Sequence, residues 1–194
     1  MDDDLTKRVA EKVRQVLGER ETVRLEAPAP RSEERLPGGA RPLKVAIGSD
    51  HRGFTLKGQL AEYMAELGHS VVDCGMKEGE PRDYPDIALA VAEKVARGLC
   101  DLGVLIDMVG VGSAIAANKI KGIRAGTCYD VEAARSSRLH NDANVLVLGS
   151  SFVNRGLARR MVRIWLETPF EGGRHQKRVD KIARLEKEGL DTRF

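Results

Sequence analysis

Aromatic residues are scarce in this chain of 194 residues, where they make up 4% of the sequence. Proteins that stack on single-stranded nucleic acid need exposed aromatic side chains, so this scarcity argues against that class. The net charge of +3 at pH 7 is too small for the basic face of a nucleic-acid binder. The chain also lacks an apolar run long enough to cross a bilayer. We therefore expect neither a nucleic-acid partner nor a membrane partner.

Cysteines are also few, and the three present are Cys74, Cys100 and Cys128. Their number is odd and no pair has the spacing of metal ligands, which argues against a disulfide framework or a zinc site. A reducing, intracellular compartment fits better. The chain begins with Met1 and three aspartates, the opposite charge to a secretory signal. We expect a cytoplasmic protein.

The first 42 residues differ in character from the rest. Residues 5–17 place apolar side chains at helical spacing along one narrow stripe, at Leu5, Val9, Val13, Val16 and Leu17. Residues 27–39 are rich in proline, glycine and charge, which is typical of a linker. The sequence thus predicts a short amphipathic helix on a tether, residues 1–42, followed by one domain, residues 43–194.

Within that domain, short apolar runs alternate with helical patterns. The predicted strands are residues 43–47, 70–73, 102–106, 123–127 and 144–148. The predicted helices are residues 55–67, 87–96, 114–119, 132–139, 155–166 and 178–188. Strands that are continuously apolar indicate a parallel sheet covered on both faces. The predicted fold class is α/β, a Rossmann-like three-layer sandwich with a five-stranded parallel sheet, whose ligands lie beyond the carboxyl ends of the strands.

Polar residues follow the first and third of these strands. Asp50 and His51 come after the first, and the pair suits either ligand binding or a helix cap by Asp50 beside a surface His51. Asp107 ends the third strand, before the loop of Gly110 and Gly112. Such a loop offers main-chain N–H groups to a phosphate or an oxyanion, although its glycines also suit a tight turn. An aspartate ending a buried strand must be paired, solvated in a cleft or functional.

Two further segments carry polar groups. His140 precedes the fifth strand and, taken alone, is more often structural. Arg174 and Arg178 are four residues apart, which places both on one helix face if Arg174 lies inside the last helix. Two such guanidinium groups suit a phosphate. A solvated basic helix start is the alternative.

Taken together, these segments resemble the ribose-5-phosphate isomerase B and galactose-6-phosphate isomerase family. The matching stretches are residues 48–54, 83–86, 110–112, 115–119, 140–146 and 171–175. They follow the order and spacing of the family from about residue 43 to residue 182. The resemblance implies interconversion of aldose and ketose phosphates through an enediol, without a metal or cofactor. It also implies a homodimer with active sites shared between the subunits, and leaves pairing into a tetramer open.

The resemblance also implies roles for individual residues. Asp50 binds sugar hydroxyls, His140 opens the furanose ring beside Asn141, and Tyr84 lines the pocket. The main-chain amides of Gly110, Gly112 and Ser113 face the enediolate oxygen. The phosphate is held by His51, Arg174 and Arg178. The expected reaction converts ribose 5-phosphate to ribulose 5-phosphate. The alternatives are another phosphosugar, or binding of a phosphosugar without catalysis.

This chain departs from the family pattern around the expected base. Asp107 stands where many members have a cysteine, and Ser113 stands where others have a glutamate. Val109 replaces a usual threonine or serine, and Ser151 replaces a frequent arginine. A thiol with a pKa near 8.5 must be activated, whereas an aspartate near 3.9 is already ionised. Our hypothesis is that Asp107 shuttles the proton, provided that burial makes it basic enough.

The N-terminal segment has its own resemblance. A short amphipathic helix tethered to an enzyme resembles the encapsulation peptides of bacterial microcompartment cargo. This interpretation predicts shell proteins as partners of residues 1–17 and a location in the microcompartment lumen. An oligomerisation helix or a disordered tail fits the same pattern, because isolated helices shorter than about 12–15 residues are marginally stable.

Overall fold

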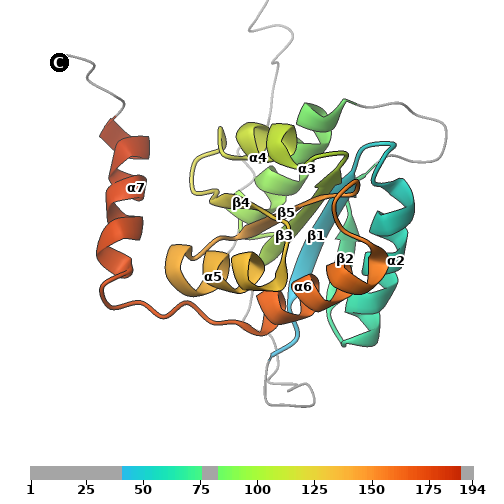
Figure 1. Cartoon of the computed structure of the whole chain (residues 1–194). Helices are drawn as coiled ribbons and strands as arrows, with labels where there is room; N and C mark the ends of the chain where they lie inside the picture. Colours follow the sequence, from blue (N-terminus) through green and yellow to red (C-terminus); the bar gives the residue numbers. More distant parts are fainter. Residues whose placement is uncertain (1–40, 76–82, 189–194) are drawn as a thin grey trace, which may run out of the picture. The chain divides into compact units, whose positions relative to one another are not determined.

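The computed structural model describes residues 41–75 and 83–188 (Figure 1). By its contacts the chain divides into two units, Met1–Glu33 and Glu34–Phe194. The predicted helix of residues 5–17 and the predicted linker of residues 27–39 lie outside the described residues. In the described part, no helix has both the length and the apolar character of a membrane-spanning segment.

A five-stranded sheet with every neighbouring pair parallel forms the centre of the domain. Its strand order is β2-β1-β3-β5-β4. The strands are β1 Lys44–Ser49, β2 Ser70–Asp73, β3 Leu102–Asp107, β4 Ala125–Cys128 and β5 Val145–Gly149. The predicted parallel sheet is confirmed, and each strand lies within three residues of its predicted bounds. The three central strands are buried almost throughout, as their continuous apolar sequences require.

Helices cover both faces of this sheet (Figure 1). The helices of the domain are α2 Phe54–Glu66, α3 Tyr84–Ala96, α4 Val111–Ala117, α5 Val131–Asn141, α6 Arg155–Glu167 and α7 Gln176–Glu188. One core joins α2, α5 and α6 to the side chains of Val104 and Ile106, around the fully buried Trp165. The other core joins α3 and α4 to Leu105, which points to the opposite face. This is the predicted three-layer sandwich.

The side chain of Asn118 forms hydrogen bonds with the outer side of the edge strand β4. The amide group of Asn118 accepts a hydrogen bond from the Ala125 N–H at 2.8 Å and donates one to the Ala125 carbonyl at 2.9 Å. It therefore pairs with β4 as another strand would. Such pairing leaves fewer free main-chain groups at the edge of the sheet.

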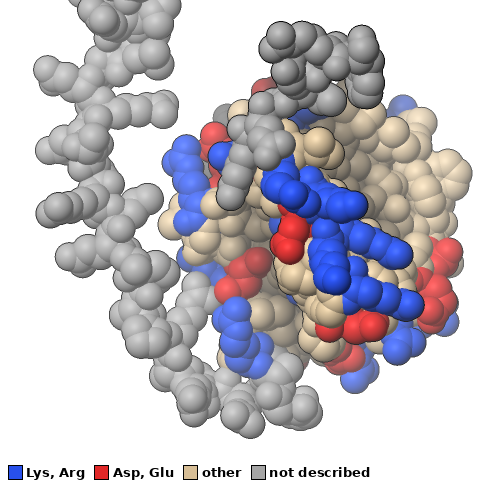
Figure 2. Space-filling model, turned by 90° about the vertical axis from the view of Figure 1, so that its left-hand side faces the viewer, with Lys and Arg blue, Asp and Glu red and all other residues tan. Residues whose placement is uncertain are grey.

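Helix α7 stands apart from the two helical layers (Figure 1). It begins at Gln176, so Arg174 precedes it and does not share a helix face with Arg178. The condition for a shared helix face is therefore not met, and the binding of a phosphate by these two arginines stays a prediction. Lysine and arginine side chains gather on the side of the molecule that Figure 2 turns toward the viewer. Exposed basic residues of α7 include Lys177, Arg178, Lys181 and Arg184.

Candidate active site

The fold separates the predicted site residues into two groups, one at the carboxyl ends of the strands and one at their amino ends. Asp107 lies at the carboxyl end of β3, and Asp50 directly follows β1. His140 and Asn141 instead end α5, four residues or so before β5 begins at Val145. Helix α5 starts at the carboxyl edge, and its path to His140 runs back by about 14 Å at 1.5 Å per residue. One chain therefore does not bring Asp107 and His140 together.

The carboxylate of Asp107 is held by the start of α4. The side chain is buried, with 6% of its surface exposed. Its Oδ1 accepts hydrogen bonds from the N–H groups of Val109, at 2.8 Å, and Gly110. Its Oδ2 accepts from the N–H of Ser113 at 3.2 Å and from the Ser113 hydroxyl at 2.5 Å. Because the positive end of a helix dipole favours a negative charge, this is a stable position for a carboxylate.

The same amides were expected to face the enediolate oxygen of a substrate. In the structure, the N–H groups of Gly110 and Ser113 point at Asp107 instead. A carboxylate offers about four lone-pair positions, and here four donors use them. A substrate oxygen could reach these amides only after Asp107 gives some of them up. The role of base and the role of the amide cradle therefore share the N–H groups of Gly110 and Ser113, whereas the N–H of Gly112 does not bond Asp107.

The shape of the loop explains its two glycines. Gly110 has a φ of 93°, in the left-handed region that favours glycine. A Cβ atom added at Gly112 would lie 2.7 Å from Cε2 of Tyr84, so the ring of Tyr84 lies directly over this residue. The Thr127 hydroxyl donates to the Gly110 carbonyl at 3.1 Å. Sequence reasoning did not assign Thr127 a role, because a threonine within a strand carries no distinctive signal.

Asp50 caps the turn that leads into α2. Its Oδ1 accepts hydrogen bonds from the N–H groups of Arg52 at 2.9 Å and Gly53 at 3.0 Å. The Asp50 N–H donates to the carbonyl of Ile106 at 3.3 Å, which places this turn beside Asp107. His51 is exposed. Asp50 thus stabilises the turn before α2, whose N-cap residue is Gly53 and receives no side-chain hydrogen bond. The binding roles of Asp50 and His51 stay predictions.

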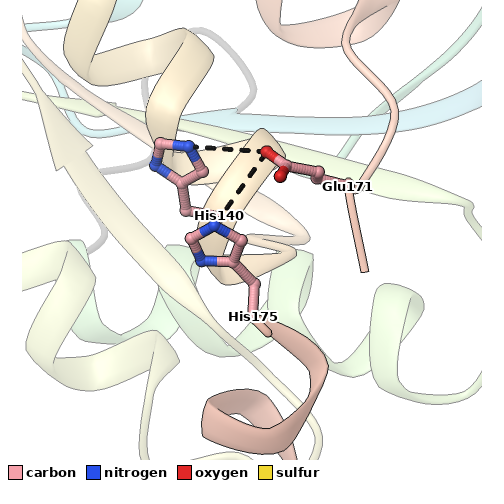
Figure 3. Close-up of side chains that lie close together, drawn as sticks. All are labelled: His140, Glu171 and His175. Atoms are coloured by element: carbon pink, nitrogen blue, oxygen red, sulfur yellow. Dashed lines mark ion pairs between the residues drawn. The ribbon is translucent and has the colours of Figure 1, made fainter. Parts of the chain in front are cut away.

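At the other edge of the sheet, His140 belongs to a cluster that the sequence did not predict (Figure 3). The His140 ring stacks on the ring of His175, with centroids 4.4 Å apart and planes at 15°. The Oε2 atom of Glu171 lies 3.8 Å from Nε2 of His140 and 3.9 Å from Nε2 of His175. Nδ1 of His140 is 2.9 Å from the hydroxyl of Ser136. Glu171 and His175 lie in a matched stretch of sequence, but no role was assigned to them.

Two histidines and a glutamate are also a common set of metal ligands, and their ligating atoms lie within 4.8 Å of one another. The geometry is nevertheless poor for a metal ion. The lone pairs of two stacked rings lie in two separate, nearly parallel planes, so one ion cannot lie in the plane of both rings. In addition, Nε of Arg174 donates to Nε2 of His175 at 3.2 Å, which uses that lone pair. Burial lowers the pKa of His175, and the neighbouring His140 lowers it further.

The family of the chain follows from sequence. Residues 45–182 match the profile of the ribose/galactose isomerase family. The chain belongs to this family. It is 48% identical over 143 residues to ribose-5-phosphate isomerase B of Escherichia coli, covering 74% of this chain and 96% of the relative. It is 38% identical over 143 residues to subunit LacA 2 of galactose-6-phosphate isomerase from Streptococcus pyogenes, covering 74% and 99%.

Solved structures of the ribose/galactose isomerase family share this fold. The ribose-5-phosphate isomerase B of Clostridium thermocellum superposes with a TM-score of 0.73 at 48% identity, covering 75% of this chain and 99% of the other. The enzyme of Mycoplasma genitalium, solved with bound ribulose 5-phosphate, gives a TM-score of 0.71 at 44% identity, covering 75% and 97%. The chain is accordingly an isomerase. The match does not include residues 1–44.

Proposed function

We propose that this isomerase interconverts the aldose and ketose forms of a phosphorylated sugar, with ribose 5-phosphate and ribulose 5-phosphate as its pair. The relatives named ribose-5-phosphate isomerase B support this choice of substrate. The observation that carries the proposal is the buried carboxylate of Asp107 at the carboxyl end of the central strand β3. In a parallel α/β sheet, this is the edge where substrates bind.

Asp107 and Ser113 together handle the proton in this proposal. The Ser113 hydroxyl turns from Asp107 to an oxygen of the open-chain sugar, which frees a lone pair on Oδ2. Asp107 then takes the proton from C2 of the aldose, and an enediolate forms. A proton moves from O2 to O1, and Asp107 returns its own proton to C1 to give the ketose. General-base catalysis by a positioned carboxylate typically contributes about 10²–10⁴-fold.

A second copy of the chain completes the site in this proposal. His140 and Asn141 lie at the edge of the sheet away from Asp107, so they serve the Asp107 of a partner subunit. Exposed apolar side chains around the glycine loop suit such a contact. They are Met108, Val111, Ile115, Tyr129 and Phe152. The partner's Arg174 and Arg178 then approach the phosphate, together with His51.

Mixing two inactive variants tests the shared site. Asp107→Asn and His140→Asn each remove one half of every site. A mixed dimer holds one site with both wild-type residues and one with neither. After unfolding and refolding together, an equimolar mixture should recover roughly one quarter of the wild-type activity. A mixture as inactive as its components would contradict the shared site.

A substrate survey tests the reaction itself. A coupled assay would compare ribose 5-phosphate with galactose 6-phosphate and other aldose phosphates, and we expect the highest kcat/KM with ribose 5-phosphate. Solvent deuterium should enter the sugar carbon next to the carbonyl group. A preference for another aldose phosphate would overturn the substrate assignment and keep the reaction.

A second candidate function is binding of a phosphosugar without catalysis. The observation that favours it is the set of four hydrogen bonds to Asp107, which engages two of the three expected cradle amides, those of Gly110 and Ser113. In this case ribose 5-phosphate binds, as measured by calorimetry, but neither turnover nor deuterium incorporation occurs. The predicted attachment of residues 1–17 to microcompartment shell proteins is compatible with either function.

A further inference from the structure

His175 is buried beneath a more exposed histidine. The side chain of His175 is only 5% exposed, whereas the side chain of His140 is 38% exposed. The two rings are nearly parallel and their centroids are 4.4 Å apart. They come from separate segments, since His140 lies in the last turn of α5 and His175 directly precedes α7. The His175 ring thus packs against one face of the His140 ring (Figure 3).

Several contacts hold the ring of His175 and its segment in place. The His175 N–H donates to the carbonyl of Gly172 at 2.9 Å, and the Glu171 N–H donates to the carbonyl of Leu139 at 3.0 Å. The second bond ties the segment to the end of α5, next to His140. Nε of Arg174 donates to Nε2 of His175, so Nε2 is an acceptor and the ring proton is assigned to Nδ1. The contact with Arg174 thus favours one orientation of the His175 ring and the tautomer with its proton on Nδ1.

The His140 ring is restricted by the same neighbours. Its Nδ1 lies 2.9 Å from the Ser136 hydroxyl, and its Nε2 lies on the side of Glu171. Rotation of the ring by 180° would break the contact with Ser136. Tilting the ring would break the stack on His175. The two contacts together leave Nε2 as the atom that is presented away from α5.

We propose that His175 is a positioning residue for His140, which its ring supports in the one orientation that presents Nε2 to the substrate. The proposal rests on the proposed function, in which His140 opens the sugar ring. His175 itself touches no substrate. The charged groups that face the pair are Glu171, Arg174 and Arg178. A small error in the placement of a catalytic group can cost about 10²-fold in rate, so the support matters for turnover.

The test uses His175→Leu, which removes the flat ring, and His175→Phe, which keeps a ring to stack on. Gln176→Leu is the control, because Gln176 is the next residue and its side chain bonds Asp180 at the surface. Long-range ¹H–¹⁵N spectra of the full chain report the tautomer of each of the four histidines. In the wild type and in the control, the nitrogens of His140 should show one dominant tautomer. In His175→Leu they should shift toward the average of two tautomers, and His175→Phe should restore most of the wild-type pattern.

Kinetics provide the second measurement. We expect His175→Leu to lower kcat for ribose 5-phosphate by about 10- to 100-fold with little change in KM, and His175→Phe to recover most of the loss. Unchanged His140 nitrogen shifts in a folded His175→Leu variant would overturn the proposal, and so would unchanged kcat. The spectra need no turnover. If the wild type is inactive but the His140 spectra change as expected, the proposed function fails while the positioning by His175 stands.

Discussion

Ser113 donates two hydrogen bonds to the same oxygen of Asp107, one from its main-chain N–H at 3.2 Å and one from its hydroxyl at 2.5 Å. Val109 and Gly110 supply the donors to the other oxygen from the main chain. Of the four donors, the Ser113 hydroxyl alone can leave by rotation of a side chain. Ser113 therefore controls whether Oδ2 of Asp107 has a lone pair free to accept a proton.

Replacing Asp107 by asparagine should remove the base and keep its shape. We expect Asp107→Asn to lose about 10²–10⁴-fold in kcat and in the rate of solvent-deuterium incorporation into the sugar. Mass spectrometry or NMR of the product sugar measures the deuterium. Asp130→Asn is a matched control, since Asp130 caps α5 in the same way by accepting from the Ala133 N–H at 2.7 Å. Asparagine caps a helix about as well as aspartate, so this variant should keep both its stability and its turnover nearly unchanged.

A folded Asp107→Asn protein with full turnover would show that Asp107 is only the cap of α4. The wild-type carboxylate would then be a structural replacement for the cysteine of other family members. The base would have to be sought among other residues of the site.

Cysteine reagents separate this chain from relatives that use a thiol. Its cysteines at 74, 100 and 128 are buried. Burial raises the pKa of Cys74 to about 11 and also raises that of Cys128. Because the thiolate is the reactive form, iodoacetamide at neutral pH should leave the native enzyme active. Asp107→Cys should become sensitive, and ribose 5-phosphate should protect it. Rapid inactivation of the wild type by iodoacetamide would contradict the prediction that its buried cysteines are unreactive.

The elements of the fold could be predicted because each carries a local signal. The run Leu102–Ile106 is continuously apolar, and Gly68 follows α2, so strand and helix limits were found to within a few residues. Predicting where the candidate site residues lie required the topology of the sheet as well as these local signals. That α5 returns His140 to the amino ends of the strands follows from a parallel sheet, and the resemblance implied a site built from two subunits without saying which residues each subunit supplies. The spacing of apolar residues along the chain does not predict how far His140 lies from Asp107.

Hydrogen-bond partners were the hardest feature to predict. The sequence showed an acceptor, Asp107, three residues before the donor Gly110, but both were assigned to a substrate and not to each other. The stack of His140 on His175 joins residues 35 positions apart in different segments, and no pattern in the sequence links them. Such contacts depend on the course of the loop between α6 and α7, which has no repeating signal.

His69 should make the protein less stable in acid. Its Nδ1 accepts a hydrogen bond from the Leu43 N–H at 3.2 Å, at the start of the sheet. Burial lowers the pKa of His69, an effect that Glu167 partly offsets. The unfolded chain therefore binds the proton more readily, and stability falls as the pH drops below the ordinary histidine value of about 6.5. When the pH falls from about 7.5 to about 5.5, the free energy of unfolding measured in urea should decrease less for His69→Asn than for the wild type. Equal losses would show that another group is responsible.

Lys57 should depend on Asp73 for its burial. Lys57 is 3% exposed, and its Nζ lies 2.6 Å and 2.9 Å from the two carboxylate oxygens of Asp73. Asp73→Asn leaves a buried charge without its counter-ion. We expect a loss of about 1–3 kcal/mol in urea unfolding, less than for a fully buried pair because the Asp73 side chain is 55% exposed. Lys57→Met in the Asp73→Asn background should recover part of it.

The control for this pair is Glu93→Gln, which breaks the exposed ion pair with Arg97. It should cost less than about 0.5 kcal/mol. An Asp73→Asn variant as stable as the control would show that water, and not Asp73, compensates the charge of Lys57.

The N-terminal segment should be dispensable for the reaction. The family match begins at residue 45, and the sheet begins with Lys44. A chain that starts at Arg41 keeps the ion pair of Arg41 with Asp101 at 3.0 Å. Its kcat/KM for ribose 5-phosphate should equal that of the full chain. If the encapsulation prediction holds, residues 1–42 fused to a fluorescent protein should form foci in cells that make microcompartment shells, because the segment would bind shell proteins. Diffuse fluorescence with shells present would reject the encapsulation prediction, and a large loss of activity on truncation would assign the segment to the active site.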